Sequence, residues 1–220
     1  MIKRIFDIFL SSFGIIISSP LWILFGLFIL IEDGRPILYF QERVGKKGEI
    51  FKVLKFRSMI KGAEDEIGPV QAKENDFRVT SVGRILRATA MDELPQLINI
   101  LKGDMSFIGP RALRPGEIEI GNWKLETGKQ EAENRNSDKV DCDKIIPLEK
   151  IPGYEGRQSV RPGLTGIAQI YLPTDAPRRK KFGYDLLYVK KQSFWLDLKL
   201  IFLSFWITFR GKWESREKKL

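Results

Sequence analysis

The longest run of apolar residues lies near the N-terminus, at residues 8–31, and contains no charged side chain. As one helix it would reach about 36 Å, enough to cross a hydrocarbon core of about 30 Å. Pro20 lies near the middle of the run, where it removes a backbone donor and favours a bend at Ser19-Pro20. The hydroxyls of Ser18 and Ser19 could satisfy the carbonyls that the proline frees. The pattern therefore predicts a membrane segment, residues 1–35 with its flanks, that bends at Ser19-Pro20.

Basic residues lie on both sides of this run. Lys3 and Arg4 precede it, and Arg35 is the first of several that follow it. A simple spanning helix has Lys and Arg mainly on one side, so the distribution favours a re-entrant hairpin whose two ends lie on the same face. An ordinary kinked spanning anchor is the alternative. A cleaved signal peptide is disfavoured, because the run is long and no small-residue cleavage site follows it.

Residues 36–220 are long enough for one further domain with its own core. Turn residues and changes of periodicity divide this region into short elements, which makes the expected fold class α+β and mostly helical. We expect strands at 37–41 and 49–59 around a turn at 44–48, two helices within 82–105 that meet near 89–91, a short apolar strand within 161–171, and a basic helix at 178–191.

Three other segments have distinct patterns. Residues 61–76 are polar and predict a loop or an exposed helix. Residues 112–156 are rich in charged residues, Asn and Gly, and predict an exposed insertion. Residues 194–209 are apolar with two tryptophans, but the uncharged part, 200–209, would cover only about 15 Å as a helix. We expect this last segment to be an interfacial amphipathic helix that does not span the membrane.

Composition restricts the chemistry. The chain has 37 basic and 28 acidic residues, a formal net charge of +9, which suits anionic lipids, phosphorylated substrates or nucleic acid. It has no histidine, so neither the commonest general base nor the commonest metal ligand is available. A single cysteine excludes an internal disulfide framework and a Cys-rich zinc site, and suggests a cytosol-facing domain. Catalysis would rest on carboxylates, Lys, Arg, Tyr, Ser or an oxygen-bound metal.

Two adjacent carboxylates, Asp92 and Glu93, stand at the start of the helix expected after residue 91. Capping of that helix is the ordinary explanation, since free N–H groups favour negative charge there. The same environment would keep Asp92 ionised as a nucleophile and leave Glu93 free to hold a hard cation. If these carboxylates act on a phosphoryl group, its charge must be neutralised, which Mg²⁺ and arginines do in phosphoryl transfer.

Several basic residues could bind phosphate. Arg87 precedes the acidic pair by five residues, and Arg111 and Arg161 lie next to Pro and Gly in SFIGPR and RPGLTG. Rigid turns can present a guanidinium for bidentate phosphate contacts, although surface solvation or helix capping would explain any one of these arginines alone. Lys55 belongs to a basic cluster at 52–57, and Asp185 in YDLLYV has an amphipathic helix as its ordinary explanation.

Seven blocks of sequence together resemble the bacterial sugar transferase family, in the small single-domain form of the monotopic polyprenyl-phosphate phosphoglycosyl transferases. The blocks are KRIFD (3–7), the apolar run broken at Ser19-Pro20, QERVG (41–45), KFRSM (55–59), MDELPQLINILKGDMSFIGPR (91–111), RPGLTGIAQ (161–169) and YDLLYVKKQSFWLDLKL (184–200). They cover nearly the whole chain apart from residues 112–156.

This resemblance implies a membrane enzyme that transfers a sugar 1-phosphate from a UDP-sugar to polyprenyl (undecaprenyl) phosphate, releases UMP and so initiates synthesis of a surface glycan. It implies that Asp92 is the nucleophile, that Glu93 binds Mg²⁺, and that Arg87, Arg111, Arg161 and Asp185 belong to the active site. Lys55 is a further candidate for binding the substrate phosphate. It also implies a re-entrant hairpin broken at Ser19-Pro20, on the cytoplasmic face of the bacterial inner membrane. Ala112 departs from the family, which usually has a second proline after GPR.

Two hypotheses of other classes remain at this stage. A membrane-tethered module that binds nucleic acid or anionic lipid would fit the charge, but no nucleic-acid motif is recognisable, so we expect no nucleic-acid partner. A catalytically silent scaffold is disfavoured by the intact Asp92-Glu93 pair. The sequence does not distinguish hexose from N-acetylated amino-sugar donors, and it leaves the polyprenol length and the oligomeric state open.

Overall fold

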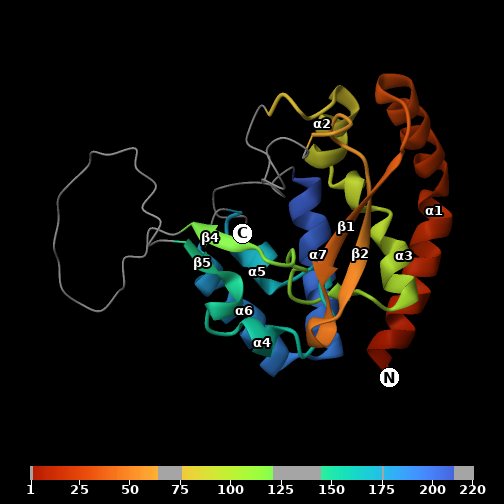
Figure 1. The fold of residues 1–220 in the computed structure, drawn as a ribbon. Coiled ribbons are helices and arrows are strands. Elements are labelled where there is room, and N and C mark those ends of the chain that lie inside the picture. The colour runs from red at the N-terminus through yellow and green to blue at the C-terminus, as the bar shows by residue number, and fades with distance from the viewer. Residues whose placement is uncertain (1, 64–75, 121–144, 175, 211–220) are drawn as a thin grey trace.

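The structure is a computed structural model that describes residues 2–63, 76–120, 145–174 and 176–210. It combines helices with short strands, as the α+β prediction requires (Figure 1). In chain order the elements are α1 (Ile2–Asp33), β1 (Leu38–Val44), η1 (Lys46–Gly48), β2 (Ile50–Phe56), α2 (Ser81–Ala88), η2 (Met91–Glu93), α3 (Gln96–Lys102), β3 (Ser106–Ile108), β4 (Ile118–Ile120), β5 (Ile145–Pro147), η4 (Leu148–Lys150), α4 (Tyr154–Arg157), β6 (Gly163–Thr165), α5 (Ile167–Tyr171), α6 (Arg178–Lys191) and α7 (Phe194–Phe209).

Helix α1 contains the apolar run, and it is long and apolar enough to cross a membrane. Pro20 lies inside it, and helical hydrogen bonding continues on both sides. Because a proline at position 20 cannot donate, the carbonyl of Ile16 loses its usual partner, and the Ser19 hydroxyl donates to it at 2.8 Å. Ser18 donates to the carbonyl of Gly14 at 2.6 Å. Ser19 therefore acts as predicted, whereas Ser18 bonds a carbonyl that Pro20 does not free. Helix α1 remains one helix, and a re-entrant hairpin is not confirmed.

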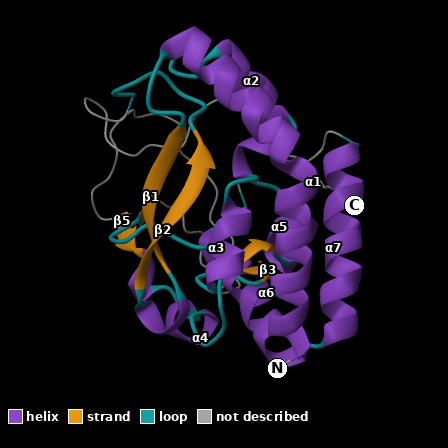
Figure 2. Ribbon diagram, turned by 90° about the vertical axis from the view of Figure 1, so that its right-hand side faces the viewer, coloured by secondary structure: helices purple, strands orange, loops and turns teal. Residues whose placement is uncertain are grey.

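Both ends of α1 are fastened to the rest of the domain. At the start of α1, the Arg4 guanidinium donates to the carbonyls of Ile100 and Leu101 near the end of α3, at 2.5 and 2.8 Å. At the other end, the Glu32 carboxylate accepts from the first two N–H groups of α2, at 2.6 and 2.9 Å. The side facing away from the domain is apolar and bare, with Ile16 71% and Ile23 76% exposed. Figure 1 shows α1 along the right-hand edge of the molecule, and Figure 2, in which that side faces the viewer, shows it in front of the domain, rising from the N-terminus at the bottom.

The strands in the described part of the chain form three two-stranded sheets. Strands β1 and β2 are the predicted antiparallel hairpin, in the register Leu38↔Phe56 to Val44↔Ile50. Strands β3 and β6 pair in parallel, although more than fifty residues separate them in the chain. Strand β3 contributes to a buried cluster with α5, α6 and α7 that includes Ile108, Ile170 and Tyr188. This parallel pair brings the SFIGPR and RPGLTG motifs into contact.

Three sequence predictions need correction or limitation. Residues 161–171 were expected to lead into an apolar strand, but the strand is only β6, and Ile167–Tyr171 form the short helix α5. The expected insertion at 112–156 is ordered at both ends, because β4 pairs with β5, and Leu148 and Ile151 are buried. Its central part, 121–144, and most of the predicted loop at 61–76 lie outside the described residues.

Helix α7 has the bounds expected for the C-terminal apolar segment. It buries Asp197 and turns aromatic side chains outward, with Trp195 78% and Phe209 87% exposed. Lys199 is a charged side chain on the exposed surface of this helix, and most of the outward side chains are apolar. The helix is confirmed, but its predicted amphipathic pattern and interfacial position are not.

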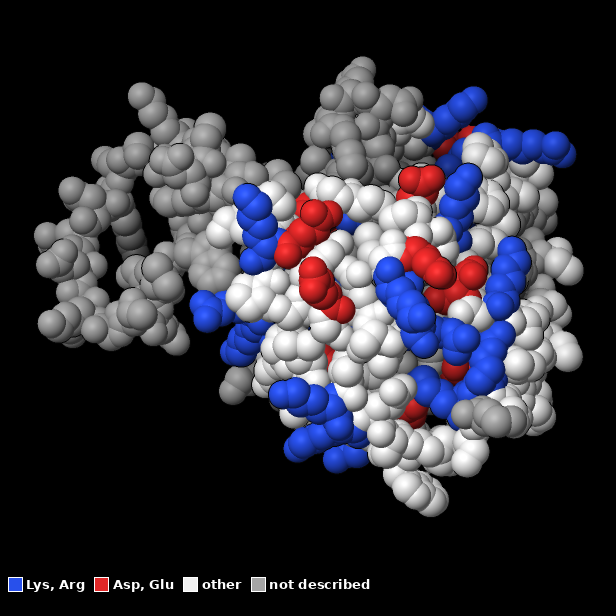
Figure 3. Space-filling model, turned by 60° about the horizontal axis from the view of Figure 1, so that its bottom comes forward, with Lys and Arg blue, Asp and Glu red and all other residues white. Residues whose placement is uncertain are grey.

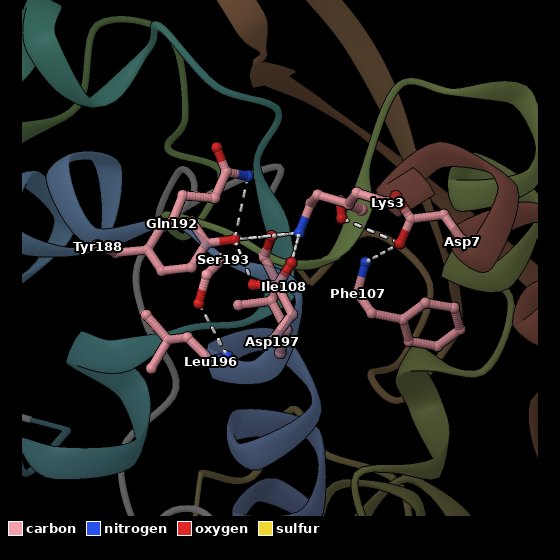
Figure 4. Close-up of polar contacts among 10 residues, drawn as sticks. Lys3, Asp7, Phe107, Ile108, Tyr188, Gln192, Ser193, Leu196 and Asp197 are labelled. Atoms are coloured by element: carbon pink, nitrogen blue, oxygen red, sulfur yellow. Dashed lines mark hydrogen bonds and ion pairs between the residues drawn. The ribbon is translucent and has the colours of Figure 1, made fainter. Parts of the chain in front are cut away.

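A buried polar cluster joins the start of α1 to α6 and α7 (Figure 4). The Lys3 ammonium donates to the Asp197 carboxylate at 2.6 Å, to the Tyr188 hydroxyl at 3.0 Å and to the Ile108 carbonyl at 3.0 Å. Tyr188 donates to the other Asp197 oxygen at 2.7 Å. Asp7, one turn further along α1, accepts from a backbone N–H of β3 at 3.3 Å. The apolar helix is thus bonded directly to the strand that leads into the GPR loop.

Candidate active site

A cavity of about 530 Å³ is lined by residues of the β1–β2 hairpin, α2, η2, the loop after β3, α5 and α6. Six of the predicted site residues line it, although they come from five separate elements: Lys55, Arg87, Asp92, Glu93, Arg111 and Asp185. Arg161, the seventh, is half-buried and is not among the described residues that line the cavity. Its predicted role in phosphate binding stays a prediction.

The backbone changes direction just before the acidic pair. Helix α2 ends at Ala88, and Ala90 adopts a left-handed conformation with φ of 55°. This conformation costs a residue with a β-carbon roughly 1–2 kcal/mol, and such strain is concentrated at functional sites. The turn begins η2, in which Asp92 and Glu93 line the cavity from a 3₁₀ turn that precedes α3.

Glu93 contacts a cation and not a helix end. Its Oε1 accepts from the Lys55 ammonium at 2.5 Å, and the same ammonium lies 3.8 Å from Oδ2 of Asp92. Burial acts to raise the pKa of Glu93, but Lys55, Arg111 and Arg43 outweigh it and hold that pKa below its usual value. Glu93 is therefore ionised at neutral pH, and Lys55 bridges both members of the acidic pair.

Arg111 is presented by a closely packed backbone crossing. Gly109 of the SFIGPR motif meets Gly163 of the RPGLTG motif, and a Cβ on Gly163 would lie 2.1 Å from the Gly109 nitrogen. Only glycine fits where two backbones approach so closely. The N–H of Gly163 then donates to the Pro110 carbonyl at 2.9 Å. The crossing explains why both motifs carry glycine. It also fixes the backbone next to Arg111, whose side chain lines the cavity.

Five arginines that we did not single out from the sequence also line the cavity: Arg43, Arg57, Arg114, Arg157 and Arg178. Arg43 belongs to β1 and Arg157 to α4. Burial, with nearby Arg111 and Arg114, lowers the pKa of Arg43 to about 10, so its guanidinium stays cationic at neutral pH. Arg43 lies in the QERVG block of the family resemblance, and this was the sequence signal that could have identified it as a site residue. Arg157 follows the charged segment 112–156 directly, where an isolated arginine looks like an ordinary solvated residue.

Asp185 of α6 is buried, and its Oδ2 accepts from Nε of Arg157 at 2.9 Å. Burial raises the pKa of Asp185, and the Arg157 guanidinium opposes that shift. The same guanidinium lies 4.7 Å from the centre of the Phe182 ring. Asp185 lines the cavity together with Arg157, its partner in this ion pair.

The acidic pair has the chemistry of a Mg²⁺ site that a substrate completes. In the part of the chain that the structure describes, no group of three or more metal-ligating acidic or Cys side chains is present. Mg²⁺ is commonly held by one or two carboxylates together with substrate phosphates and water. Asp92 and Glu93 in a cavity lined by cations fit that pattern, because the cations would attract the phosphates that supply the remaining ligands.

Charge on the outer surface is mixed. Figure 3 shows Lys and Arg side chains in several separate groups on the face it presents, with Asp and Glu between them. Within the cavity, Lys55 forms an ion pair with Glu93, and Lys55, Arg111 and Arg43 lower the pKa of the Glu93 carboxyl. A cavity of this kind can bind a phosphorylated substrate, with a phosphate group next to the acidic pair Asp92 and Glu93.

Comparisons with known proteins agree with these features. The family described as bacterial sugar transferase matches residues 1–211. A UDP-glucose:undecaprenyl-phosphate glucose-1-phosphate transferase of Klebsiella pneumoniae is 36% identical over 216 residues, which are 96% of this chain and 40% of that protein. An exopolysaccharide production protein, PSS, of Rhizobium leguminosarum bv. phaseoli is 37% identical over 207 residues, which are 92% of each chain.

A third relative acts on a different sugar. The UDP-N-acetylgalactosamine-undecaprenyl-phosphate N-acetylgalactosaminephosphotransferase of Aeromonas hydrophila is 37% identical over 204 residues, which are 91% of this chain and 42% of that protein. The chain therefore spans about two fifths of the Klebsiella and Aeromonas proteins and nearly the whole of the Rhizobium protein. Because relatives named for glucose and for N-acetylgalactosamine are equally similar, overall identity does not single out a sugar.

Proposed function

The chain belongs to the bacterial sugar transferase family, and from this membership we propose that it transfers a sugar 1-phosphate from a UDP-sugar to undecaprenyl phosphate. The product would be a lipid-linked sugar diphosphate that initiates a surface polysaccharide. The observation that carries the proposal is the position of Asp92 and Glu93 in a cavity of about 530 Å³ that Lys55, Arg87 and Arg111 also line. A carboxylate nucleophile and phosphate-binding cations are the parts that this transfer needs.

We propose two displacements at one phosphorus atom. In the first, an oxygen of the Asp92 carboxylate bonds to the phosphorus that carries the sugar, and the bond to UMP breaks with its electron pair leaving on UMP. In the second, a phosphate oxygen of the polyprenyl phosphate bonds to that phosphorus, and the aspartyl bond breaks to restore the carboxylate. Neither attack needs a protein base, because carboxylates and phosphate monoesters are ordinarily ionised near neutral pH. This suits a chain that has no histidine.

We further propose that Glu93 holds Mg²⁺ when the donor is bound. The metal would neutralise charge on the diphosphate. Lys55 contributes at the same point, since its ammonium lies 2.5 Å from Glu93 and 3.8 Å from Asp92. Arg111 and Arg43 are close enough to lower the pKa of Glu93. They can therefore help to neutralise the negative charge of the substrate phosphates.

The membrane arrangement that we propose is monotopic, with α1 as a re-entrant segment bent at Ser19-Pro20 and the domain on the cytoplasmic face. Its support is that both ends of α1 are bonded to the same domain, while the outward side of α1 is apolar and exposed. A helix that crossed the bilayer would have to release one of these ends. The bare aromatic side of α7 would lie against lipid as well.

Site-directed labelling tests this topology. In a Cys142→Ser background, we expect Ile2→Cys and Arg35→Cys to react with a membrane-impermeant maleimide in inverted vesicles and not in intact spheroplasts. The reason is that both flanks of α1 would lie on the cytoplasmic face. Reaction of Ile2→Cys from the periplasmic side would mean that α1 spans the membrane.

A donor panel tests the reaction itself. We expect purified protein in undecaprenyl phosphate vesicles to release UMP from one or a few UDP-sugars, with Mg²⁺, and to form the matching lipid-linked sugar. Relatives with glucose and N-acetylgalactosamine donors make UDP-glucose and UDP-N-acetylgalactosamine the first to assay. If no UDP-sugar in the panel yields UMP, while RNA or DNA binds tightly with a steep salt dependence, the protein would instead be a basic binding module. We propose no nucleic-acid partner, since the sequence has no recognisable nucleic-acid-binding motif.

A further inference from the structure

We propose that Arg157 is a positioning residue that holds the Arg111 loop in its active geometry, with Asp185 as its buried counter-ion. This inference rests on the proposed function for its effect on catalysis. It concerns the short segment at residues 109–113, which follows β3 and carries Arg111 into the cavity.

The backbone of this segment is held at every carbonyl from 110 to 113. The first and the last accept hydrogen bonds from backbone N–H groups of neighbouring segments, at 2.9 and 2.8 Å. The carbonyl of Arg111 accepts from Nη2 of Arg157 at 2.6 Å, and the next carbonyl accepts from Arg43 at 3.1 Å. The Arg157 side chain supplies the hydrogen bond to the Arg111 carbonyl. Loss of this donor would release the loop at the residue that lines the cavity.

Arg157 is itself fixed on three sides. Its Nε donates to Asp185 at 2.9 Å, its Nη2 donates to the Arg111 carbonyl, and its guanidinium lies over the Phe182 ring. The side chain is 5% exposed, so these contacts are made away from bulk water. A planar guanidinium can serve two acceptors at fixed angles, which an ammonium cannot do. Arg157 therefore holds the loop at a fixed place relative to α6, because it bonds Asp185 of α6 and the Arg111 carbonyl at the same time.

In this geometry Asp185 acts through Arg157, whose guanidinium it holds in place. Its carboxylate is 3% exposed and bonded to Arg157, so it is placed to hold that guanidinium rather than to meet the donor first. An unpaired buried charge is costly, and the pair Arg157–Asp185 is stable only when both members are present. Asp185 and Arg157 thus form one unit that supports Arg111.

The test combines hydrogen exchange with a double-mutant cycle. Arg157→Lys keeps the charge and removes the fork, and we expect it to increase deuterium uptake in the peptide that covers residues 105–113. With the preferred UDP-sugar, we expect a loss of kcat/KM of about 10- to 100-fold, since a misplaced phosphate-binding group has effects of this size. In an Arg111→Ala background, the same change should lower kcat/KM by less than about threefold, because residues that act through one another are not additive.

Ile29→Ala is the matched control for destabilisation. Ile29 is buried in a different cluster, with Phe56 and Leu86, that contains no residue of segment 105–113. It should lower the melting temperature and leave deuterium uptake at 105–113 and kcat/KM nearly unchanged. Unchanged uptake in Arg157→Lys, or an undiminished effect in the Arg111→Ala background, would overturn the proposal. If the wild-type protein turned over no UDP-sugar, the proposed function would fail, and the exchange experiment would still decide whether Arg157 holds the loop.

Discussion

Asp92→Asn should reduce UMP release from the preferred UDP-sugar by on the order of 10⁴-fold or more, which is the scale on which removal of a nucleophile acts. The substitution preserves the size of the side chain and removes its charge, so the amide would no longer attack phosphorus. Asp92 is only slightly exposed and lies 3.8 Å from Lys55, so its place in the cavity does not depend on a long flexible segment. UMP release measured by a coupled assay, with and without undecaprenyl phosphate, gives the result.

The control for this variant is Asp104→Asn. Asp104 follows α3, lies outside the cavity and accepts from the Asn99 side chain at 3.3 Å, which an asparagine oxygen can also do. Its turnover should stay close to that of the wild type. Thermal unfolding of both variants would show that they are folded. Wild-type turnover by a folded Asp92→Asn protein would rule out the aspartyl mechanism and leave direct transfer between the two substrates.

Lys55→Met should lower kcat/KM by about 10²-fold, the usual effect of removing one preorganised electrostatic contact. It should also move the acid limb of the pH–rate profile to higher pH, because Lys55 is the strongest of the charges that lower the pKa of Glu93.

The same pKa shift determines how the free energy of unfolding depends on pH. A carboxylate with a depressed pKa stabilises the folded state above its unfolded pKa, and this contribution is lost as pH falls through the folded pKa. Without Lys55 the contribution should be absent at neutral pH.

Lys52→Met is the control for this variant. Lys52 lies on the same strand, is exposed and does not line the cavity. Its pH–rate profile and its stability between pH 4 and pH 8 should match those of the wild type. An unshifted acid limb in Lys55→Met would mean that the ionisation of Glu93 does not limit the reaction.

Periodicity and residue type were sufficient for the larger elements. The uncharged run predicted α1, and the position of Pro20 predicted that serine hydroxyls would bond freed carbonyls, as Ser19 does with Ile16. The β-branched and aromatic residues on either side of the turn at 44–48 predicted the β1–β2 hairpin, and the basic segment 178–191 and the apolar segment 194–209 predicted the helices α6 and α7. Each of these signals extends over several residues of one segment, so no knowledge of tertiary contacts is required.

The features that sequence reasoning missed depend on contacts between distant segments. Strands β5 and β6 have only three residues each, which is too short for a period, and the Ile and Ala residues of α5 resemble a buried strand. Arg157 belongs to the site because it reaches Asp185 and the Arg111 carbonyl, 28 and 46 residues away in the chain. No local pattern marks an arginine for such a contact.

The most direct measurement of the central claim is the mass of the protein after incubation with its UDP-sugar donor and Mg²⁺ in the absence of polyprenyl phosphate. The two-step mechanism predicts up to one equivalent of UMP and a matching mass increase of one sugar phosphate on the peptide that contains Asp92. Addition of undecaprenyl phosphate should remove this mass, and Asp92→Asn should never acquire it. Rapid turnover with no adduct, and UMP release that strictly requires the lipid, would contradict the account.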